Sequence, residues 1–271
     1  MKIVFNRKCL SYKFNNHPEN PERVRRIVEI LKQNGFSFVR AEKAKKEDIL
    51  LVHTIEHFER VKNKNYFDFD TPHIDIVYPL ISAGCAIKAA KIEGFSVSRP
   101  PGHHAGKDFL GGFCYFNNIA IAVEKLNLKT AILDLDAHHG NGTEDIFLGD
   151  ERVLYVSLHE EGIFPGTGLV SRQNCINFPL PAFTEENFYL KTLNKALLEI
   201  KRFNPEILAI SMGFDTYFKD PLTHFKLKKE SYFKIGKAIK KLEIPFFVVL
   251  EGGYSEDIGE LALQFLRGLI D

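Results

Sequence analysis

The stretch from residue 130 to residue 142, TAILDLDAHHGNG, combines a strand with residues able to do chemistry. Its first part, Thr130–Leu135, is almost entirely apolar, as expected of a strand buried on both faces of a parallel sheet. Asp134, Asp136 and His138 occupy alternate positions, so an extended backbone directs all three toward one face. The pattern predicts a buried strand that carries a candidate metal site at its carboxyl end.

Further apolar runs have the same character and alternate with amphipathic segments. The predicted strands are Val153–Leu158, Ile207–Ser211 and Pro245–Leu250, with a shorter candidate at Phe95–Ser98. The predicted helices are Glu22–Asn34, Ile76–Glu93, Asn117–Leu126, Glu185–Arg202, Lys229–Leu242 and Asp257–Leu269, with Thr184 as a candidate N-cap. This alternation predicts one α/β domain over residues 1–271, with a mainly parallel sheet covered by helices.

The composition excludes several classes of partner. The 271 residues include 36 Lys and Arg against 35 Asp and Glu, so no global field favours nucleic acid or an anionic membrane. The four cysteines are far apart and form no C-x-x-C pair, which argues against a disulfide framework or a zinc ribbon. No apolar run approaches the ~20 residues of a membrane span. We expect a cytoplasmic protein with no nucleic-acid or membrane partner, and the oligomeric state stays open.

Asp215 follows the apolar run ILAIS and could complete a site of two aspartates and one histidine. Such a site leaves a position open for water and substrate, which distinguishes catalytic from structural zinc. The alternative for Asp215 alone is a helix N-cap. For the first stretch, the alternative is ordinary strand-end carboxylates and a satisfied histidine. Two acids and two histidines between residues 134 and 139 favour the metal.

Two loops add candidate acid–base groups. In Arg99-Pro-Pro-Gly-His103-His104, the prolines stiffen the backbone and hold two adjacent histidines, which suggests proton transfer. The alternative is a pair of exposed or structural histidines. In Leu250-Glu-Gly-Gly-Tyr254, paired glycines allow a sharp turn from which a phenol can project into a site.

Taken together, these motifs resemble the zinc-dependent histone deacetylase family, in its class II-like branch with bacterial and archaeal members. The matching segments are HPENPER (17–23), RPPGHHA (99–105), GGFCYFNNIAIA (111–122), DLDAHHGNGTEDIF (134–147), VSLHE (156–160), FPGTG (164–168), GFDTYFKDPL (213–222) and LEGGY (250–254). The resemblance spans nearly the whole chain. It implies an arginase-like, three-layer α/β/α fold with the site at the strand carboxyl ends.

The resemblance also implies two metal sites. Asp136, His138 and Asp215 would bind Zn²⁺, although two carboxylates and one imidazole could also hold Fe²⁺. A structural K⁺ would lie beneath the catalytic metal. Its implied ligands are Asp134, Ser157 and the backbone carbonyls of Asp136, His138 and Leu158.

Roles for the acid–base groups follow from the same resemblance. His103 would hydrogen-bond Asp134, while His104 would be the principal general base. Tyr254 would donate its hydroxyl to the substrate carbonyl as negative charge develops there. Asn141 stands where part of the family has Asp, so it can orient His104 but cannot stabilise an imidazolium by charge. We expect a lower pKa for His104 than in relatives that carry Asp.

The substrate tunnel is the last implied feature. Gly112, Phe113 and Phe164 match the walls of a narrow tunnel that suits the methylenes of an acylated lysine. Leu222 stands where polyamine deacetylases of the family carry a glutamate. We therefore expect an acylated lysine or a similar acylated amine as substrate, with an acetylated polyamine or a small metabolite as the alternative.

These residues argue against two remote alternatives. A binuclear manganese ureohydrolase would need further aspartates at positions that hold Gly140 and Tyr217 here. A catalytically inactive acyl-binding protein predicts the loss of a metal ligand, a base or Tyr254. All of these groups are retained.

Overall fold

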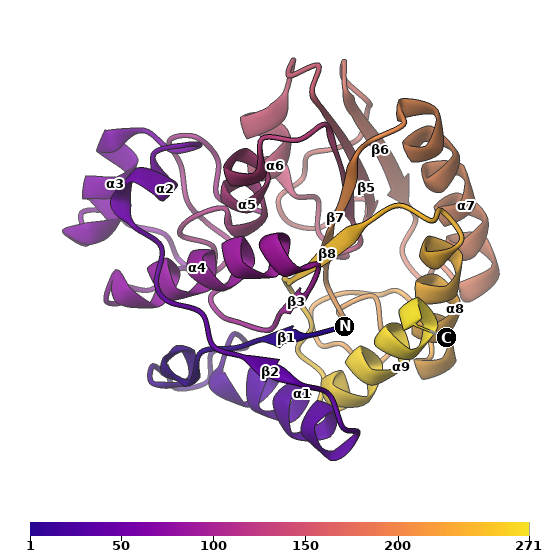
Figure 1. Cartoon of the computed structure of the whole chain (residues 1–271), viewed down its shortest axis with the longest axis horizontal. Helices are drawn as coiled ribbons and strands as arrows, with labels where there is room; N and C mark the ends of the chain where they lie inside the picture. Colours follow the sequence, from indigo (N-terminus) through magenta and orange to yellow (C-terminus); the bar gives the residue numbers. More distant parts are fainter. Residues whose placement is uncertain (271) are drawn as a thin grey trace.

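The computed structural model describes residues 1–270, which form a sheet of eight strands in the order β2-β1-β3-β8-β7-β4-β5-β6. All neighbouring strands are parallel, which confirms the predicted sheet (Figure 1). The strands are β1 (Ile3–Val4), β2 (Phe38–Val39), β3 (Phe95–Ser96), β4 (Thr130–Asp134), β5 (Val153–Glu160), β6 (Cys175–Leu180), β7 (Ile207–Met212) and β8 (Phe246–Leu250). The four strongest strand predictions correspond to β8, β7, β4 and β5, which are contiguous in the sheet.

Helices cover both faces of the sheet, as Figure 1 shows. They are η1 (Arg7–Leu10), α1 (Pro21–Gln33), α2 (Lys46–Ile49), α3 (Ile55–Lys62), α4 (Val77–Ile92), α5 (Asn118–Leu126), α6 (Asn141–Phe147), α7 (Glu186–Phe203), α8 (Lys229–Lys240) and α9 (Ile258–Ile270). Leu133 of β4 packs in the core beneath α1, α7, α8 and α9, whereas the adjacent Ile132 packs against α5 and α6. Alternate residues of one strand thus bury against opposite helical layers.

The six predicted helices correspond to α1, α4, α5, α7, α8 and α9, with small shifts at their ends. Two details differ from the predictions. The N-cap of α7 is Glu185, and the Thr184 hydroxyl donates instead to the carbonyl of Pro181. Strand β5 continues to Glu160, two residues past the predicted end at Leu158, so His159 lies within the strand.

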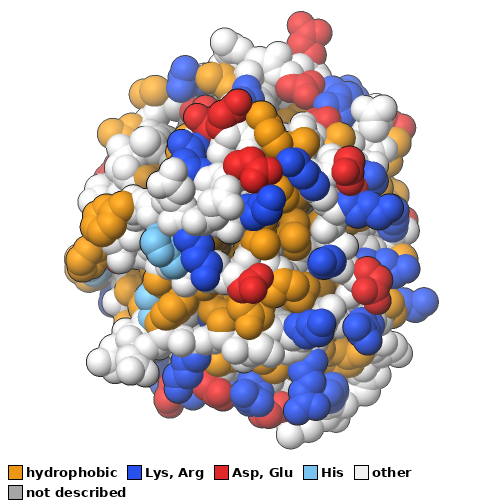
Figure 2. Space-filling model, turned by 90° about the vertical axis from the view of Figure 1, so that its left-hand side faces the viewer, with side chains coloured by type: hydrophobic (Ala, Val, Ile, Leu, Met, Phe, Trp, Pro, Cys, Tyr) orange, Lys and Arg blue, Asp and Glu red, His pale blue; other side chains and the backbone are white. Residues whose placement is uncertain are grey.

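The surface carries charges of both signs. Figure 2 shows Lys and Arg side chains interspersed with Asp and Glu on one side of the molecule, in keeping with the formal net charge of +1. Within residues 1–270, none of the helices combines the length and the apolar character needed to cross a bilayer.

Helix α1 matters for the site because it carries Arg23 to the sheet edge. The Asn20 side chain accepts from the N–H of Glu22, and Pro21 occupies the first turn, so the helix start is well defined. Its buried face packs into the core with Val24, Ile27, Val28 and Leu31. Arg23 is also buried and points toward the residues after β8.

A buried ionic cluster ties the chain before α1 to the loop after β3. Glu19 accepts from Nε and Nη2 of Arg99, each at 2.6 Å, and from Nη1 of Arg23 at 3.3 Å. Nη1 of Arg99 donates to the carbonyls of Cys9 and Tyr12. Burial acts to raise the pKa of Glu19, but the Arg99 guanidinium holds that pKa below its usual range.

Glu19→Gln is expected to lower the free energy of unfolding by about 3–5 kcal/mol, because Arg99 would remain buried without its counter-charge. Urea unfolding at pH 7 measures this loss. Glu22→Gln is the matched control, since its partner Arg25 is well exposed and such pairs contribute only about 0–1 kcal/mol. Similar losses in both variants would contradict a special role for the buried cluster.

Candidate active site

The carboxyl ends of β3, β4, β7 and β8 bring together chain segments that are far apart in sequence. Asp136 and His138 follow β4, and Asp215 follows the neighbouring strand β7. His103 and His104 come from the loop after β3, and Tyr254 from the turn after β8. Parallel strands end at the same edge of the sheet, so the predicted site residues converge there.

Asp136, His138 and Asp215 form a compact cluster of candidate ligands. Nδ1 of His138 lies 3.0 Å from Oδ1 of Asp136 and 2.9 Å from Oδ2 of Asp215. One candidate ligand atom from each residue lies within 4.8 Å of the other two. Both carboxylates are buried, while His138 is partly open to the cavity. The structure thus brings together the three residues predicted to bind the metal.

The chemistry of this cluster fits a divalent cation. Burial, and then the neighbouring Asp136 carboxylate, raise the pKa of Asp215, so two charged carboxylates are costly here without a positive partner. A Cβ at Gly252 would lie 2.5 Å from Oδ2 of Asp136 and 2.6 Å from Oδ2 of Asp215. Only glycine leaves this space free beside the two carboxylates. Two carboxylates and one imidazole suit Zn²⁺ and also Fe²⁺.

Each histidine of the adjacent pair has its own partner. Nδ1 of His103 donates to Oδ2 of Asp134 at 3.1 Å, and Nδ1 of His104 donates to Oδ1 of Asn141 at 2.8 Å. The two rings lie side by side, with centroids 4.0 Å apart. These are the pairings that the sequence resemblance implies.

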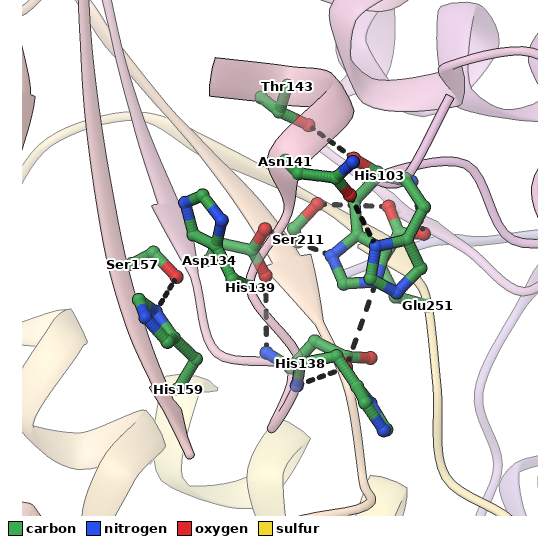
Figure 3. A network of polar contacts seen from close by, with 12 residues as sticks. His103, Asp134, His138, His139, Asn141, Thr143, Ser157, His159, Ser211 and Glu251 are labelled. Carbon is green, nitrogen blue, oxygen red and sulfur yellow. Dashed lines mark hydrogen bonds and ion pairs between the residues drawn. The ribbon is translucent and has the colours of Figure 1, made fainter. Parts of the chain in front are cut away.

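The loop that holds the histidine pair is anchored by Glu251. Oε2 of this residue accepts from the backbone N–H groups of Gly102 at 2.7 Å and His103 at 3.2 Å. Oε1 accepts from the hydroxyl of Ser211 at 2.9 Å, and Figure 3 shows this pair beside His103. The residue after β8 therefore fixes the loop after β3.

The surroundings shift the pKa values of the two histidines in opposite directions. Burial, and then the neighbouring His103, lower the pKa of His104 well below its usual value. Burial alone would also lower the pKa of His103, but the carboxylates of Asp136 and Asp134 raise it to about 10. His104 is therefore the one of the pair that is neutral and able to accept a proton at neutral pH.

Tyr254 is held by contacts that the sequence did not reveal. Its N–H donates to Oδ2 of Asp220 at 2.7 Å. The guanidinium of Arg23 lies 4.5 Å from the Tyr254 ring centroid, and its Nε donates to the carbonyl of Gly253 at 2.6 Å. Arg23 belongs to the segment HPENPER, which the sequence analysis matched to the family, but its contact with Tyr254 was not predicted. An arginine placed among the apolar positions of an amphipathic helix is the sequence signal that could have indicated this role.

These side chains surround a cavity of about 250 Å³. The predicted tunnel residues Gly112, Phe113, Phe164 and Leu222 all line it, together with His103, His104, Asp136, His138 and Tyr254. Pro18, Asp70, Pro101, Ile163 and Gly252 complete the wall. A Cβ at Gly112 would lie 2.5 Å from the His104 ring and 2.7 Å from the Phe164 ring, so a larger residue would close the passage.

The residues implied to bind potassium come from β4, from the segment directly after it, and from β5. Asp134 and Ser157 are register partners on β4 and β5. The Tyr155 hydroxyl donates to Oδ2 of Asp134 at 3.0 Å, and Ser157 Oγ lies 2.8 Å from Nδ1 of His159, a pair visible in Figure 3. Leu158 follows in β5. The potassium site itself stays a prediction.

A second metal would need aspartates at positions 140 and 217, and neither position can hold a ligand here. A Cβ at Gly140 would lie 2.6 Å from the Tyr155 hydroxyl, so the site has no room for a carboxylate. Tyr217 is buried, and its hydroxyl donates to Asp257 at 2.9 Å. The binuclear ureohydrolase alternative is therefore not favoured.

Two buried carboxylates and an imidazole, placed beside a neutral histidine at the strand ends of a parallel α/β sheet, are typical of metal-dependent hydrolases. Comparison with known proteins narrows this class.

Residues 17–269 match the model of the histone deacetylase domain. A probable deacetylase from Archaeoglobus fulgidus is 36% identical, over 93% of this chain and 81% of the relative. The crystal structure of the HDA15 HD domain has a TM-score of 0.91 at 29% identity, covering 99% of this chain and 88% of that one. An acetylpolyamine aminohydrolase from Burkholderia pseudomallei has a TM-score of 0.89 at 25% identity, covering 99% and 98%. The chain belongs to the histone deacetylase family, with its arginase-like α/β/α fold, and is a hydrolase.

Proposed function

We propose that this chain is a zinc-dependent deacetylase that hydrolyses the amide of an acylated lysine or a similar acylated amine. The observation that carries the proposal is the arrangement around one narrow cavity: the triad of Asp136, His138 and Asp215 lies beside His104, and Tyr254 also lines the wall. When bound, the metal would supply Lewis acidity to the substrate carbonyl and to water. Fe²⁺ could fill the same three ligands, and a structural K⁺ near Asp134 is part of the proposal.

His104 acts as the general base. Because Oδ1 of Asn141 accepts from Nδ1 of His104, the proton of the neutral ring resides on Nδ1 and Nε2 is free to accept another. Nε2 takes a proton from the attacking water and later returns it to the departing amine. His103 is positioned by Asp134, whose carboxylate favours the protonated form of the ring.

Tyr254 donates its hydroxyl to the carbonyl oxygen as negative charge develops on it. Burial raises the pKa of Tyr254 well above its usual value, so the phenol keeps its proton and remains a donor. The side chains of Phe113 and Phe164 hold the apolar part of the substrate in line.

The cavity wall favours an acyl-lysine over a polyamine. Leu222 presents an apolar side chain where a carboxylate would be needed to attract a secondary ammonium group. Asp220, the nearest acid in sequence, has both oxygens engaged by backbone N–H groups and is not free to bind an amine. Asp70 lines the cavity and is the alternative reader of a polyamine.

Hydrolysis of N-acyl-lysine peptides and N-acetylspermidine by zinc-loaded protein tests the proposal, read as relative kcat/KM. We expect the peptides to be preferred, and we expect Leu222→Glu to shift the ratio toward the polyamine by ~1–3 kcal/mol, roughly 5- to 150-fold. Leu222→Gln is the control of similar size without charge. Wild-type protein that prefers acetylspermidine and is indifferent to Leu222→Glu would place the determinant at Asp70. Absence of amide hydrolysis across the panel would contradict the proposed function.

A further inference from the structure

Asp220 occupies a distinctive place between the cavity wall and the turn that carries Tyr254. It lies in the segment after β7, and its side chain is buried. Oδ2 accepts from the N–H of Tyr254 at 2.7 Å, and Oδ1 accepts from the N–H of Leu222 at 3.0 Å. One carboxylate therefore joins two segments that both line the cavity.

We infer that Asp220 is a positioning residue that sets the Tyr254 phenol relative to the Leu222 wall. The inference rests on the proposed function, because it assigns Asp220 a role in that reaction. Asp220 does not line the cavity, so it acts through the two residues that it holds.

The turn before Tyr254 needs a residue that anchors it, meaning one that fixes its backbone by hydrogen bonds. Gly252 and Gly253 precede the tyrosine, and Gly253 has φ 108°, a conformation that ordinary side chains rarely adopt. Two glycines give the turn little rigidity of its own. Arg23 holds the carbonyls of Glu251 and Gly253, whereas Asp220 holds the N–H of Tyr254 itself.

The geometry requires a carboxylate at position 220. Two N–H donors face the two side-chain oxygens, so both oxygens must be acceptors. Burial raises the pKa of Asp220 to about 6, while the two N–H donors favour the charged form, and at neutral pH the group is mainly a carboxylate. Asparagine would turn an NH₂ group toward one of the two N–H groups and lose that hydrogen bond.

The segment that carries Asp220 is itself held by hydrogen bonds. The N–H of Asp220 donates to the carbonyl of Tyr217 at 2.8 Å. The N–H of Leu222 donates to Oδ1 of Asp220, which closes a short turn across Pro221. Proline restricts the backbone of the residue before it, which favours one orientation of Asp220. A rigid carboxylate can therefore transmit its position to the flexible glycine turn.

Asp220→Asn should lower kcat on an N-acetyl-lysine peptide by about 10- to 100-fold, the scale expected when a catalytic group is misplaced by about 1 Å. KM should change much less, and metal content and thermal unfolding should stay close to wild type. Asp257→Asn is the matched control, since Asp257 lies nearby and bonds Tyr217 but does not line the cavity. It should leave kcat unchanged.

The decisive measurement places Asp220→Asn in a Tyr254→Phe background. If Asp220 acts through the phenol, the second substitution should add almost nothing to the first. Hydrogen exchange at the Tyr254 amide should also become faster in Asp220→Asn, a readout that does not depend on activity. Asp220→Glu, which keeps two acceptors, replaces Asp220→Asn in the cycle if the latter does not fold.

Full additivity in the cycle, or normal turnover and normal exchange in Asp220→Asn, would overturn the inference. An inactive wild-type protein would instead sink the proposed function. In that case, faster exchange at Tyr254 would still support the anchor.

Discussion

Asp136→Ala, His138→Ala and Asp215→Ala are each expected to lose the bound metal and, with it, amide hydrolysis. The three candidate ligand atoms come from two strand ends and lie within 4.8 Å of one another, so removing any one of them leaves two of the three ligands. Loss of a residue that only supports a metal ligand already costs ~10–100-fold in affinity, and loss of a ligand should cost more. Elemental analysis and amide hydrolysis measure the two effects.

Wild-type protein should hold one catalytic transition-metal ion per chain, and chelation should abolish activity that Zn²⁺ then restores. Asp108→Ala is a suitable control, because this exposed aspartate pairs with Arg60 away from the cavity. Two catalytic metals per chain would revive the ureohydrolase alternative. Variants that lose a ligand but keep full activity would show that the cluster is structural.

Tyr254→Phe is expected to lower kcat by roughly two to three orders of magnitude, the usual cost of removing one donor to a developing oxyanion. The ring contacts with Arg23 and with Phe113, whose centroid is 5.7 Å away, do not need the hydroxyl. The fold and the metal should therefore be retained, and KM should move far less than kcat.

Tyr217→Phe is the matched control for this variant, because it removes a phenol that bonds Asp257 outside the cavity. Turnover in that control should stay near wild type. Near-normal turnover in Tyr254→Phe would instead make Tyr254 a packing residue.

The fold was predictable where burial on both faces produced continuous apolar runs. Strands β4, β5, β7 and β8 have that character, whereas β1 and β2 have only two residues each and show no period. The end of β5 was missed because His159 and Glu160 look like loop residues. Both are buried with polar partners: His159 with Ser157, and Glu160 with the N–H of His224. Such partners are supplied by tertiary structure, which local sequence does not contain.

In the candidate site, too, some residues could be predicted from the sequence and others could not. The candidate metal ligands, the histidine pair and Tyr254 lie in short motifs whose spacing and family resemblance could be read directly. Arg23 meets Gly253 across 230 positions of the chain, and Asp220 meets Tyr254 across 34. Contacts of this kind depend on which strand ends are neighbours. The strand order β8-β7-β4 is therefore needed before the support of Tyr254 can be derived.

The position of β8 has a consequence for the order in which the protein can assemble. This strand is the last of the eight in sequence, yet it lies between β3 and β7, where it joins the β2-β1-β3 group to the β7-β4-β5-β6 group. During synthesis both groups emerge from the ribosome before the strand that connects them. Until β8 inserts, β3 and β7 present open edges that can pair with other chains. These edges therefore stay open until the same strand that precedes Tyr254 has entered the sheet.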